Sequence, residues 1–299
     1  MPSSGGELSL SDLETVRNLV SQRYGFWVKD EWFGQLRSKV VQRMRTIGEP
    51  GFAAYRRRLE LHDGETTELQ ELVEELLNHE SQFNRNPEQL ALLKSEVLLG
   101  WRETMAPWPK RIVSLGCSTG EEAYSLAILA EQVLGERADD VLILGMDVSR
   151  RALAAARQAQ YSEFRLRDVP SGDRARCFTK EGELWAVHPR LRKRVRFLQQ
   201  NLVEPLPTSS LDVIFCCNVL IYFPVEAAQR LLRQFYSALK PYGHLFLGHA
   251  DSFVLPPELF RPIEDGSSRC FVRQPASALN LNSFPDDLSS AHRHEPACQ

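Results

Sequence analysis

The sequence predicts an α/β fold, with a parallel sheet covered by helices on both faces and a helical module in front of it. Beyond residue 108, short apolar segments of strand length alternate with longer segments of helical periodicity. Before that point, apolar residues recur at helical spacing without strand-like runs. The 299 residues are 43% apolar and 25% charged, which is ordinary for a globular chain and excludes a wholly disordered or fibrous protein.

The helical module is predicted over residues 1–100, with a linker that extends to about residue 108. Its first helix is expected to begin at Ser11, because Ser11 and Glu14 have the spacing of a capping box. Further helices are expected at residues 31–45, 51–61, 66–78 and 87–99.

The sheet is predicted within residues 109–274. Its strands are expected at residues 111–116, 141–147, 194–199, 211–217 and 243–249. Its helices are expected at residues 120–134, 149–158 and 224–240. Residues 160–198 interrupt this alternation with short alternating runs, which predict a small antiparallel β insertion. Residues 275–299 are rich in Pro, Ser and Asn and poor in apolar residues, so we expect a disordered tail.

Charge and cysteine content limit the class of protein. The formal net charge is −3, so the chain as a whole is no polycationic binder of nucleic acid. No apolar run approaches the roughly 18 residues of a membrane span, and the first ten residues lack the pattern of a signal peptide. Six cysteines without a CxxC pair are typical of reduced thiols. We therefore expect a cytoplasmic protein with no metal, no nucleic-acid partner and no membrane insertion.

The most informative segment is SLGCSTGEEAYS, residues 114–125. A strand leads into Gly116, Gly120 closes a turn, and a helix follows. Such a turn lets a ligand approach the amides at a helix N-terminus, beyond the carboxyl ends of the strands. Glu121 and Glu122 lie in the first helical turn and would repel a pyrophosphate. A cationic or zwitterionic ligand therefore fits better than a dinucleotide.

Two other interpretations of this turn are open. Residues 116–120 also match G-x-S-x-G, the nucleophile elbow of α/β-hydrolases. The chain order allows Ser118, Asp212 and His249 to form the triad of such a serine hydrolase. The turn can also be a purely structural connection between a strand and a helix.

Asp147 favours a nucleoside ligand. It ends the second strand, 31 residues after Gly116, where an acidic side chain can accept hydrogen bonds from both hydroxyls of a ribose. The alternative is that Asp147 caps the next helix. Together, Glu122 and Asp147 describe a pocket for a nucleoside that carries a positive group. S-adenosylmethionine has such a combination, because it joins an adenine and a ribose to a sulfonium and an amino-acid end.

Four separated segments carry a resemblance to a known family. They are HESQFNR (79–85), GCSTGEEAYSLAI (116–128), CCNVLIYF (216–223) and LFLGHADSF (245–253). In this order they are similar to signatures of the CheR family of chemotaxis-receptor glutamate methyltransferases. The resemblance covers about residues 10–274 and implies a Rossmann-like SAM-dependent methyltransferase fold behind an N-terminal helical domain. It implies S-adenosyl-L-methionine as cofactor, S-adenosyl-L-homocysteine as product and receptor glutamates as substrate.

The resemblance also implies roles for residues at matching positions. Cofactor contacts are implied for His79, Ser81, Arg85, Gly116, Glu122, Asp147, Asn201, Leu202, Cys217 and Asn218. Arg85 would also help to organise the active site and Tyr222 would lie near the transferred methyl group, so these two are the catalytic candidates. Cys217 replaces the usual arginine, and Asn84 replaces the usual second phenylalanine of the linker motif. These departures leave a non-catalytic SAM-binding signalling module as an alternative.

Basic residues gather in the second and third predicted helices. Residues 35–59 hold seven Lys or Arg and one Glu, which suits either an acidic receptor helix or an ordinary solvated face. The docking candidates are Arg37, Lys39, Arg43 and Arg45. The expected partner is the cytoplasmic helical domain of a chemoreceptor, bound by a monomer.

Some family members tether a receptor's C-terminal pentapeptide through a glycine-containing loop. The connection in FTKEGELW (178–185) is shorter, so no such tether is expected.

Overall fold

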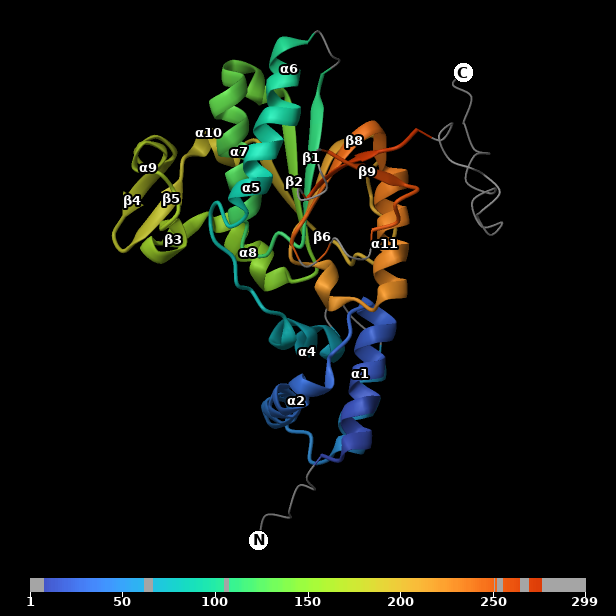
Figure 1. Ribbon diagram of the computed structural model, residues 1–299. Helices are drawn as coiled ribbons and strands as arrows, with labels where there is room; N and C mark the ends of the chain where they lie inside the picture. The colour runs from blue at the N-terminus through green and yellow to red at the C-terminus, as the bar shows by residue number, and fades with distance from the viewer. Residues whose placement is uncertain are drawn as a thin grey trace, which may run out of the picture.

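The computed structural model describes residues 8–61, 67–104, 108–249, 251, 255–263 and 269–275, and Figure 1 shows their arrangement. The disordered tail expected at residues 275–299 therefore lies outside the described residues, apart from residue 275. A group of N-terminal helices lies at one end of the molecule, next to the α/β part. None of the helices within these ranges is long and apolar enough to cross a membrane.

The N-terminal helices pack around a core of their own. They are α1 (Leu10–Tyr24), the 3₁₀ turn η1 (Asp30–Trp32), α2 (Phe33–Ile47), α3 (Phe52–Glu60) and α4 (Glu68–Leu76). Their buried side chains include Leu13, Leu36, Tyr55 and Leu72, which form one apolar cluster. The predicted capping box of the first helix is wrong by two residues, because it is made by Ser9 with Asp12 rather than by Ser11 with Glu14, and the helix begins at Leu10.

The main sheet has seven strands in the order β6-β2-β1-β7-β8-β10-β9. The strands are β1 (Lys110–Leu115), β2 (Val141–Asp147), β6 (Val195–Gln199), β7 (Leu211–Cys216), β8 (Leu239–Leu247), β9 (Phe260–Pro262) and β10 (Cys270–Arg273). The first five strands of this order pair in parallel, and β10 pairs antiparallel with β8 and β9. The Rossmann-like fold is thus confirmed, with its topological switch point between β1 and β7. The short strands β9 and β10 were not predicted.

Helices cover both faces of this sheet. One face packs against α7 (Glu121–Leu134) and a continuous helical segment before β1, made of α5 (Pro87–Leu92), the π-helix η2 (Leu93–Leu98) and α6 (Leu99–Glu103). The other face packs against α11 (Val225–Ala238). Neighbouring strand residues alternate between the two cores: Ile112 belongs to the first and Val113 to the second. This alternation explains why both strand faces are apolar in the sequence.

A second, three-stranded antiparallel sheet confirms the predicted insertion. Its order is β3-β5-β4, with β3 (Gln160–Ser162), β4 (Phe178–Glu181) and β5 (Leu184–Val187). Its short helical segments are η4 (Glu163–Leu166), α9 (Ser171–Cys177) and α10 (Pro189–Arg192). The sheet projects to one side of the α/β part in Figure 1. The expected insertion of 160–198 is too long, because β6 pairs with β2 in the main sheet.

Candidate functional site

A cavity of about 530 Å³ lies at the carboxyl ends of β1, β2, β6 and β7. The loops that follow these strands form one side of it, and residues of α1, α2 and the segment after α4 form the other. Its volume lies within the range of about 300–1,000 Å³ that is usual for sites of small ligands. The cavity therefore occupies the place where open α/β sheets bind their ligands.

All the residues that the resemblance marks as cofactor or catalytic positions line this one cavity. They are His79, Ser81, Arg85, Gly116, Glu122, Asp147, Asn201, Leu202, Cys217, Asn218 and Tyr222. They come from the linker after α4 and from the loops that follow four different strands. The fold thus brings together residues that lie up to 143 positions apart, as from 79 to 222.

The turn after β1 requires glycine at Gly116. Its φ of 68° is in the left-handed region, and a Cβ there would lie only 2.5 Å from Cγ2 of Val219. Glycine, which has no Cβ, avoids both the strain of the left-handed conformation and the clash with Val219. The turn therefore packs closely against the loop after β7, and α7 begins at once beyond it.

Glu122 presents a buried carboxylate to the cavity from the first turn of α7. Burial raises the pKa of Glu122 to about 7, while the hydrogen bond from Ser114 and the positive charge of Arg85 act in the opposite direction. Ser114 Oγ donates this hydrogen bond over 2.7 Å. The carboxylate is thus held in place, and a cationic ligand would favour its charged form.

Asp147 ends β2 with both carboxylate oxygens anchored to the backbone. Its Oδ2 accepts from the amide of Ser118 at 2.8 Å and its Oδ1 from the amide of Ser149 at 2.9 Å. Each oxygen keeps a further lone pair for a ligand hydroxyl. Burial raises the pKa of Asp147. The alternative that Asp147 caps the next helix is wrong, because Ser149 is the N-cap of α8 (Arg150–Gln158).

Asp251, which was not among the predicted site residues, fastens the loop after β7. This fully buried carboxylate accepts hydrogen bonds from the amides of Asn218 at 2.6 Å, Ile221 at 3.1 Å and Gly248 at 3.0 Å. Asn218 adopts a left-handed φ of 62°. Asp251 lies in the segment LFLGHADSF, so the motif that suggested the family also contained the signal for this residue.

Tyr222 lies on the 3₁₀ turn η5 (Leu220–Tyr222), where the loop after β7 meets the N-terminal helices. Its carbonyl accepts a hydrogen bond of 2.8 Å from the amide of Trp27. Its ring centroid is 6.1 Å from that of Trp32, which also lines the cavity. Trp32 was not predicted as a site residue, because an aromatic residue near a helix start has no distinguishing pattern in the sequence.

The two departures from the family pattern have different structural consequences. Asn84 has a φ of 56°, which asparagine tolerates better than phenylalanine, and its Nδ2 donates to the carbonyl of Asp168 at 3.1 Å. Cys217 is buried, and burial raises its pKa well above the usual value. A neutral thiol therefore occupies the place of a cation, while Arg85 extends along the linker and donates to the carbonyl of Glu80 at 2.6 Å.

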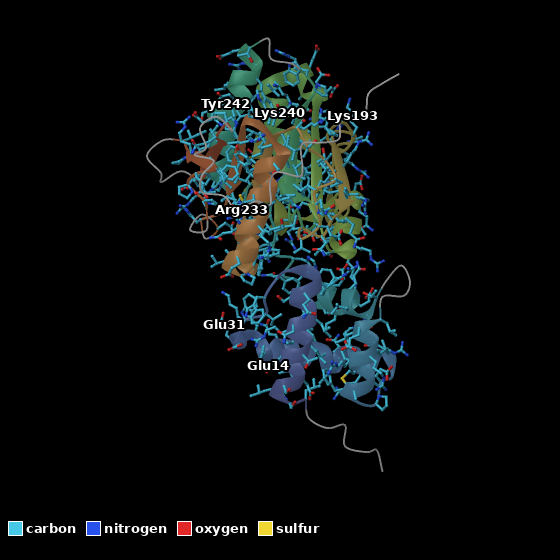
Figure 2. The ribbon with its side chains drawn as sticks, turned by 90° about the vertical axis from the view of Figure 1, so that its right-hand side faces the viewer. Glu14, Glu31, Lys193, Arg233, Lys240 and Tyr242 are labelled. Carbon is cyan, nitrogen blue, oxygen red and sulfur yellow. The ribbon has the colours of Figure 1, made fainter. Side chains whose placement is uncertain are left out.

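The structure does not assemble the hydrolase triad. Asp212 lies at the amino end of β7, whereas Ser118 follows the carboxyl end of the parallel strand β1. Asp212 is paired with Lys240 at 2.8 Å, and Figure 2 shows Lys240 far from the N-terminal helices that border the cavity. His249 is exposed, and its Nδ1 accepts from Arg269 at 3.2 Å. The match to G-x-S-x-G is therefore a strand-to-helix turn without a nucleophile's partners.

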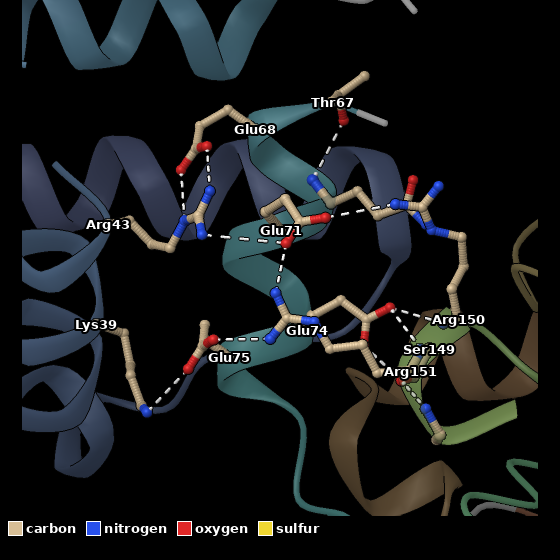
Figure 3. A network of polar contacts seen from close by, with 12 residues as sticks. Lys39, Arg43, Thr67, Glu68, Glu71, Glu74, Glu75, Ser149, Arg150 and Arg151 are labelled. Carbon is tan, nitrogen blue, oxygen red and sulfur yellow. Dashed lines mark hydrogen bonds and ion pairs between the residues drawn. The ribbon is translucent and has the colours of Figure 1, made fainter. Parts of the chain in front are cut away.

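The docking candidates on α2 divide into two pairs. Arg43 forms a bidentate ion pair with Glu68 at 2.6 and 2.9 Å, and Lys39 contacts Glu75 at 3.2 Å (Figure 3). Both side chains are therefore engaged within the helical domain. Arg37 and Arg45 instead line a shallow groove on the surface of α2, although Arg37 also donates to the carbonyl of Leu8.

The donor set of the cavity fits an S-adenosylmethionine. Glu122 offers a negative partner for an ammonium group, Asp147 offers acceptors for ribose hydroxyls, and the buried Oγ of Ser118 has no protein partner within the described residues. No group of three or more His, Cys, Asp or Glu side chains in the described ranges is arranged to hold a metal ion. The fold and the site define a Rossmann-like SAM-binding methyltransferase domain joined to a helical domain.

Comparison with known families makes the assignment specific. Residues 79–267 match "CheR methyltransferase, SAM binding domain" and residues 11–77 match "CheR methyltransferase, all-alpha domain". The chain belongs to the CheR methyltransferase family, and S-adenosylmethionine is its cofactor. The predicted family, fold class and cofactor are confirmed.

Several curated relatives are similar along much of this chain. A probable biofilm formation methyltransferase, WspC, of Pseudomonas putida is 34% identical over 73% of this chain and 52% of its own length. Chemotaxis protein methyltransferase 2 of Pseudomonas aeruginosa is 32% identical over 84% of this chain and 90% of its own. The Escherichia coli chemotaxis protein methyltransferase is 31% identical over 82% and 86%. The chain thus spans about half the length of one of these relatives and most of the other two.

Proposed function

We propose that this chain methylates the side-chain carboxylates of glutamate residues on the cytoplasmic helical domain of a chemoreceptor. The observation that carries this proposal is the arrangement of one cavity. It places Glu122 and Asp147, suited to the cofactor, beside Arg85 and Tyr222, suited to an anionic substrate. The names of the chemotaxis methyltransferases that the chain resembles support the same reaction and the same class of partner.

The loops after different strands would bind different parts of the cofactor. When bound, S-adenosylmethionine supplies an electrophilic methyl group on its sulfonium. Glu122 would hold the ammonium group of the amino-acid end, and Asp147 would hold the ribose. Asn201 and Leu202 follow β6 and would border the adenine. The side-chain amide of Asn201 also donates to the carbonyl of Arg23 at 2.8 Å, so it ties this border to α1.

The chemistry demands orientation rather than a base. A glutamate side chain has a pKa of about 4.3 and is ionised at neutral pH, so its oxygen can attack without losing a proton first. Arg85 would attract and orient this carboxylate, while Tyr222 and Trp32 would exclude water from it. Orienting two reactants in this way can contribute roughly 7–11 kcal/mol to catalysis. The methyl ester that forms is neutral, so each turnover removes one negative charge from the receptor.

Two further features concern the partner. Arg37 and Arg45 would face an acidic receptor helix from the groove on α2.

In the small sheet, β4 and β5 are joined through only two residues, Gly182 and Glu183, between the paired Glu181 and Leu184. Such a short hairpin supports a reaction that does not depend on a C-terminal pentapeptide tether. We also propose that the protein acts as a monomer in the cytoplasm.

The test is to incubate the protein with methyl-labelled S-adenosylmethionine and candidate receptor cytoplasmic domains. Base-labile methyl esters are expected on the receptor, and they should disappear when the receptor's acceptor glutamates are changed to alanine. An Asp147→Ala variant is the matched control on the enzyme. Label that resists base would contradict ester formation.

The neutral Cys217 favours one second candidate, a SAM-binding signalling module that does not transfer the methyl group. This candidate predicts tight uptake of S-adenosylmethionine with no labelled receptor under any condition. Turnover on a receptor would exclude it.

A further inference from the structure

Helix α4 carries four glutamates into the space between α2 and α8, as Figure 3 shows. They are Glu68, Glu71, Glu74 and Glu75. Glu68 and Glu75 contact the basic side chains of α2 described above. Glu71 and Glu75 also contact the guanidinium group of Arg151, at 2.5 and 2.8 Å. The glutamates of α4 thus connect the helical domain to the start of α8 through ion pairs.

Glu74 differs from the other three because it contacts the backbone at the N-terminus of α8. Its side chain is buried, and the residue is only 6% exposed. Its Oε1 accepts from the amide of Arg150 at 2.6 Å, and its Oε2 accepts from the hydroxyl of Ser149 at 2.5 Å. A carboxylate at this end of a helix satisfies free amides and interacts favourably with the helix dipole. The helical domain therefore supplies part of the cap of α8.

The capped residue is directly connected to the cofactor site. Ser149 is fully buried, and its amide donates to Oδ1 of Asp147, whose Oδ2 accepts from Ser118 in the glycine turn. Contacts thus run without interruption from Glu74 through Ser149 to Asp147. Glu74 itself does not line the cavity, whereas Asp147 does. An influence of Glu74 on a bound cofactor is therefore indirect, and the hydrogen bonds through Ser149 to Asp147 provide a route for it.

We propose that Glu74 is a positioning residue for cofactor binding, which holds the turn after β2 so that Asp147 meets the ribose. This inference rests on the proposed role of Asp147. It makes the helical domain a contributor to cofactor affinity through a carboxylate that does not touch the cofactor.

The test measures the dissociation constant of S-adenosylhomocysteine by calorimetry with the full chain. Glu74→Gln keeps the size of the side chain and removes its charge, so we expect binding to weaken about 5- to 20-fold. Glu71→Gln is the matched control, because Glu71 lies on the same helix but its side chain contacts arginine side chains of α2 and α8 rather than the backbone of α8. It should change the dissociation constant less than about two-fold.

A double-mutant cycle separates positioning from a general loss of stability. In an Asp147→Asn background, Glu74→Gln should weaken binding less than about two-fold further, because the residue through which it acts has already been altered. Ser149→Ala interrupts the same connection and leaves Glu74 intact. Its effect on the dissociation constant should likewise be smaller in the Asp147→Asn background.

The outcomes distinguish the two proposals. If the unchanged protein takes up no S-adenosylhomocysteine, the proposed function fails and this inference with it. If it binds and Glu74→Gln binds equally well, only the role of Glu74 is overturned. Equal losses from Glu74→Gln with and without Asp147→Asn would also overturn it, since they would show that Glu74 acts independently of the ribose site.

Discussion

Ser114 on β1 and Glu122 on α7 are joined by a hydrogen bond of 2.7 Å from the serine hydroxyl to the carboxylate. The bond holds a buried acid at the edge of the sheet, where burial raises its pKa to about 7. The acid is therefore only partly ionised at neutral pH. An entering cation would complete its ionisation, so ligand binding and proton release are coupled at this residue.

Binding of S-adenosylhomocysteine should depend on pH through Glu122. We expect affinity to fall as the pH is lowered from 8 to 6, because protonated Glu122 no longer attracts the ammonium group. Calorimetry near pH 6.5 in two buffers of different ionisation enthalpy should show a proton released on binding. Glu122→Gln should bind at least about ten-fold more weakly at pH 8 and lose this proton release. Equal proton release in both proteins would show that another group is responsible.

Glu122 should also affect stability in the unliganded protein. Its folded pKa of about 7 lies above the usual 4.5, so the native state binds more protons than the unfolded chain between these values. This contribution to the free energy of unfolding therefore decreases as the pH rises through that window. Glu122→Gln should stabilise the unliganded protein at pH 8 by up to about 3 kcal/mol, and by little at pH 4.5. Urea denaturation at several pH values measures both effects. A destabilised variant at pH 8 would contradict this account.

Arg43 and Arg45 should respond differently to substitution. Removing Arg43 leaves the nearly buried Glu68 without its ion-pair partner, so Arg43→Ala should cost about 3 kcal/mol of stability. Arg45 is exposed, and Arg45→Glu should leave the melting temperature and cofactor affinity unchanged while raising KM for the receptor several-fold.

The control for Arg45 is Lys193→Glu, an equal charge change on the α/β part of the molecule (Figure 2). If both charge reversals raise KM equally, a general electrostatic effect rather than docking on α2 would be the cause.

Asp251→Asn should weaken the loop that carries Tyr222. The amide has one acceptor oxygen where the carboxylate has two, so one or more of its backbone donors would lose a partner. We expect a loss of about 2 kcal/mol in stability, and kcat to fall about ten-fold or more if the loop shifts. Thermal unfolding and steady-state kinetics measure these two quantities. Unchanged kcat in a destabilised variant would limit Asp251 to a structural role.

A receptor-tail pentapeptide should not bind tightly to this protein. The reason is that only two residues connect β4 and β5, whereas the tether of some family members is a longer loop at this place. Calorimetry with the free peptide should show no heat of binding at micromolar concentrations, and removing the tail from a receptor substrate should leave the methylation rate unchanged. Tight binding of the peptide would refute the expectation.

The strands and the cavity residues could be predicted from the sequence because short, continuous segments of the chain identify them. Parallel strands buried on both faces are continuous apolar runs, and the glycine turn with Glu122 and Asp147 follows two of them directly. β9 and β10 were missed because strands of three or four residues resemble any short apolar stretch.

The ion pair of Arg43 and the role of Asp251 could not be predicted in the same way. Arg43 finds its partner Glu68 25 positions later, on another helix, and a count of basic residues contains no information about that pairing. Asp251 acts on amides up to 33 residues earlier, which only the folded chain brings near it. The sequence indicated which residues are present at the site, and the fold decides which charges remain available.

The fastening of the Asn218 loop by Asp251 has a consequence for synthesis of the protein. Asp251 comes after Phe223, the last residue that lines the cavity. A chain still emerging from the ribosome therefore has every lining residue before it has the carboxylate that fastens the loop after β7. Polypeptides that terminate before residue 251 should therefore be unable to complete the cavity. Newly made enzyme should acquire its ligand only after translation has passed this point.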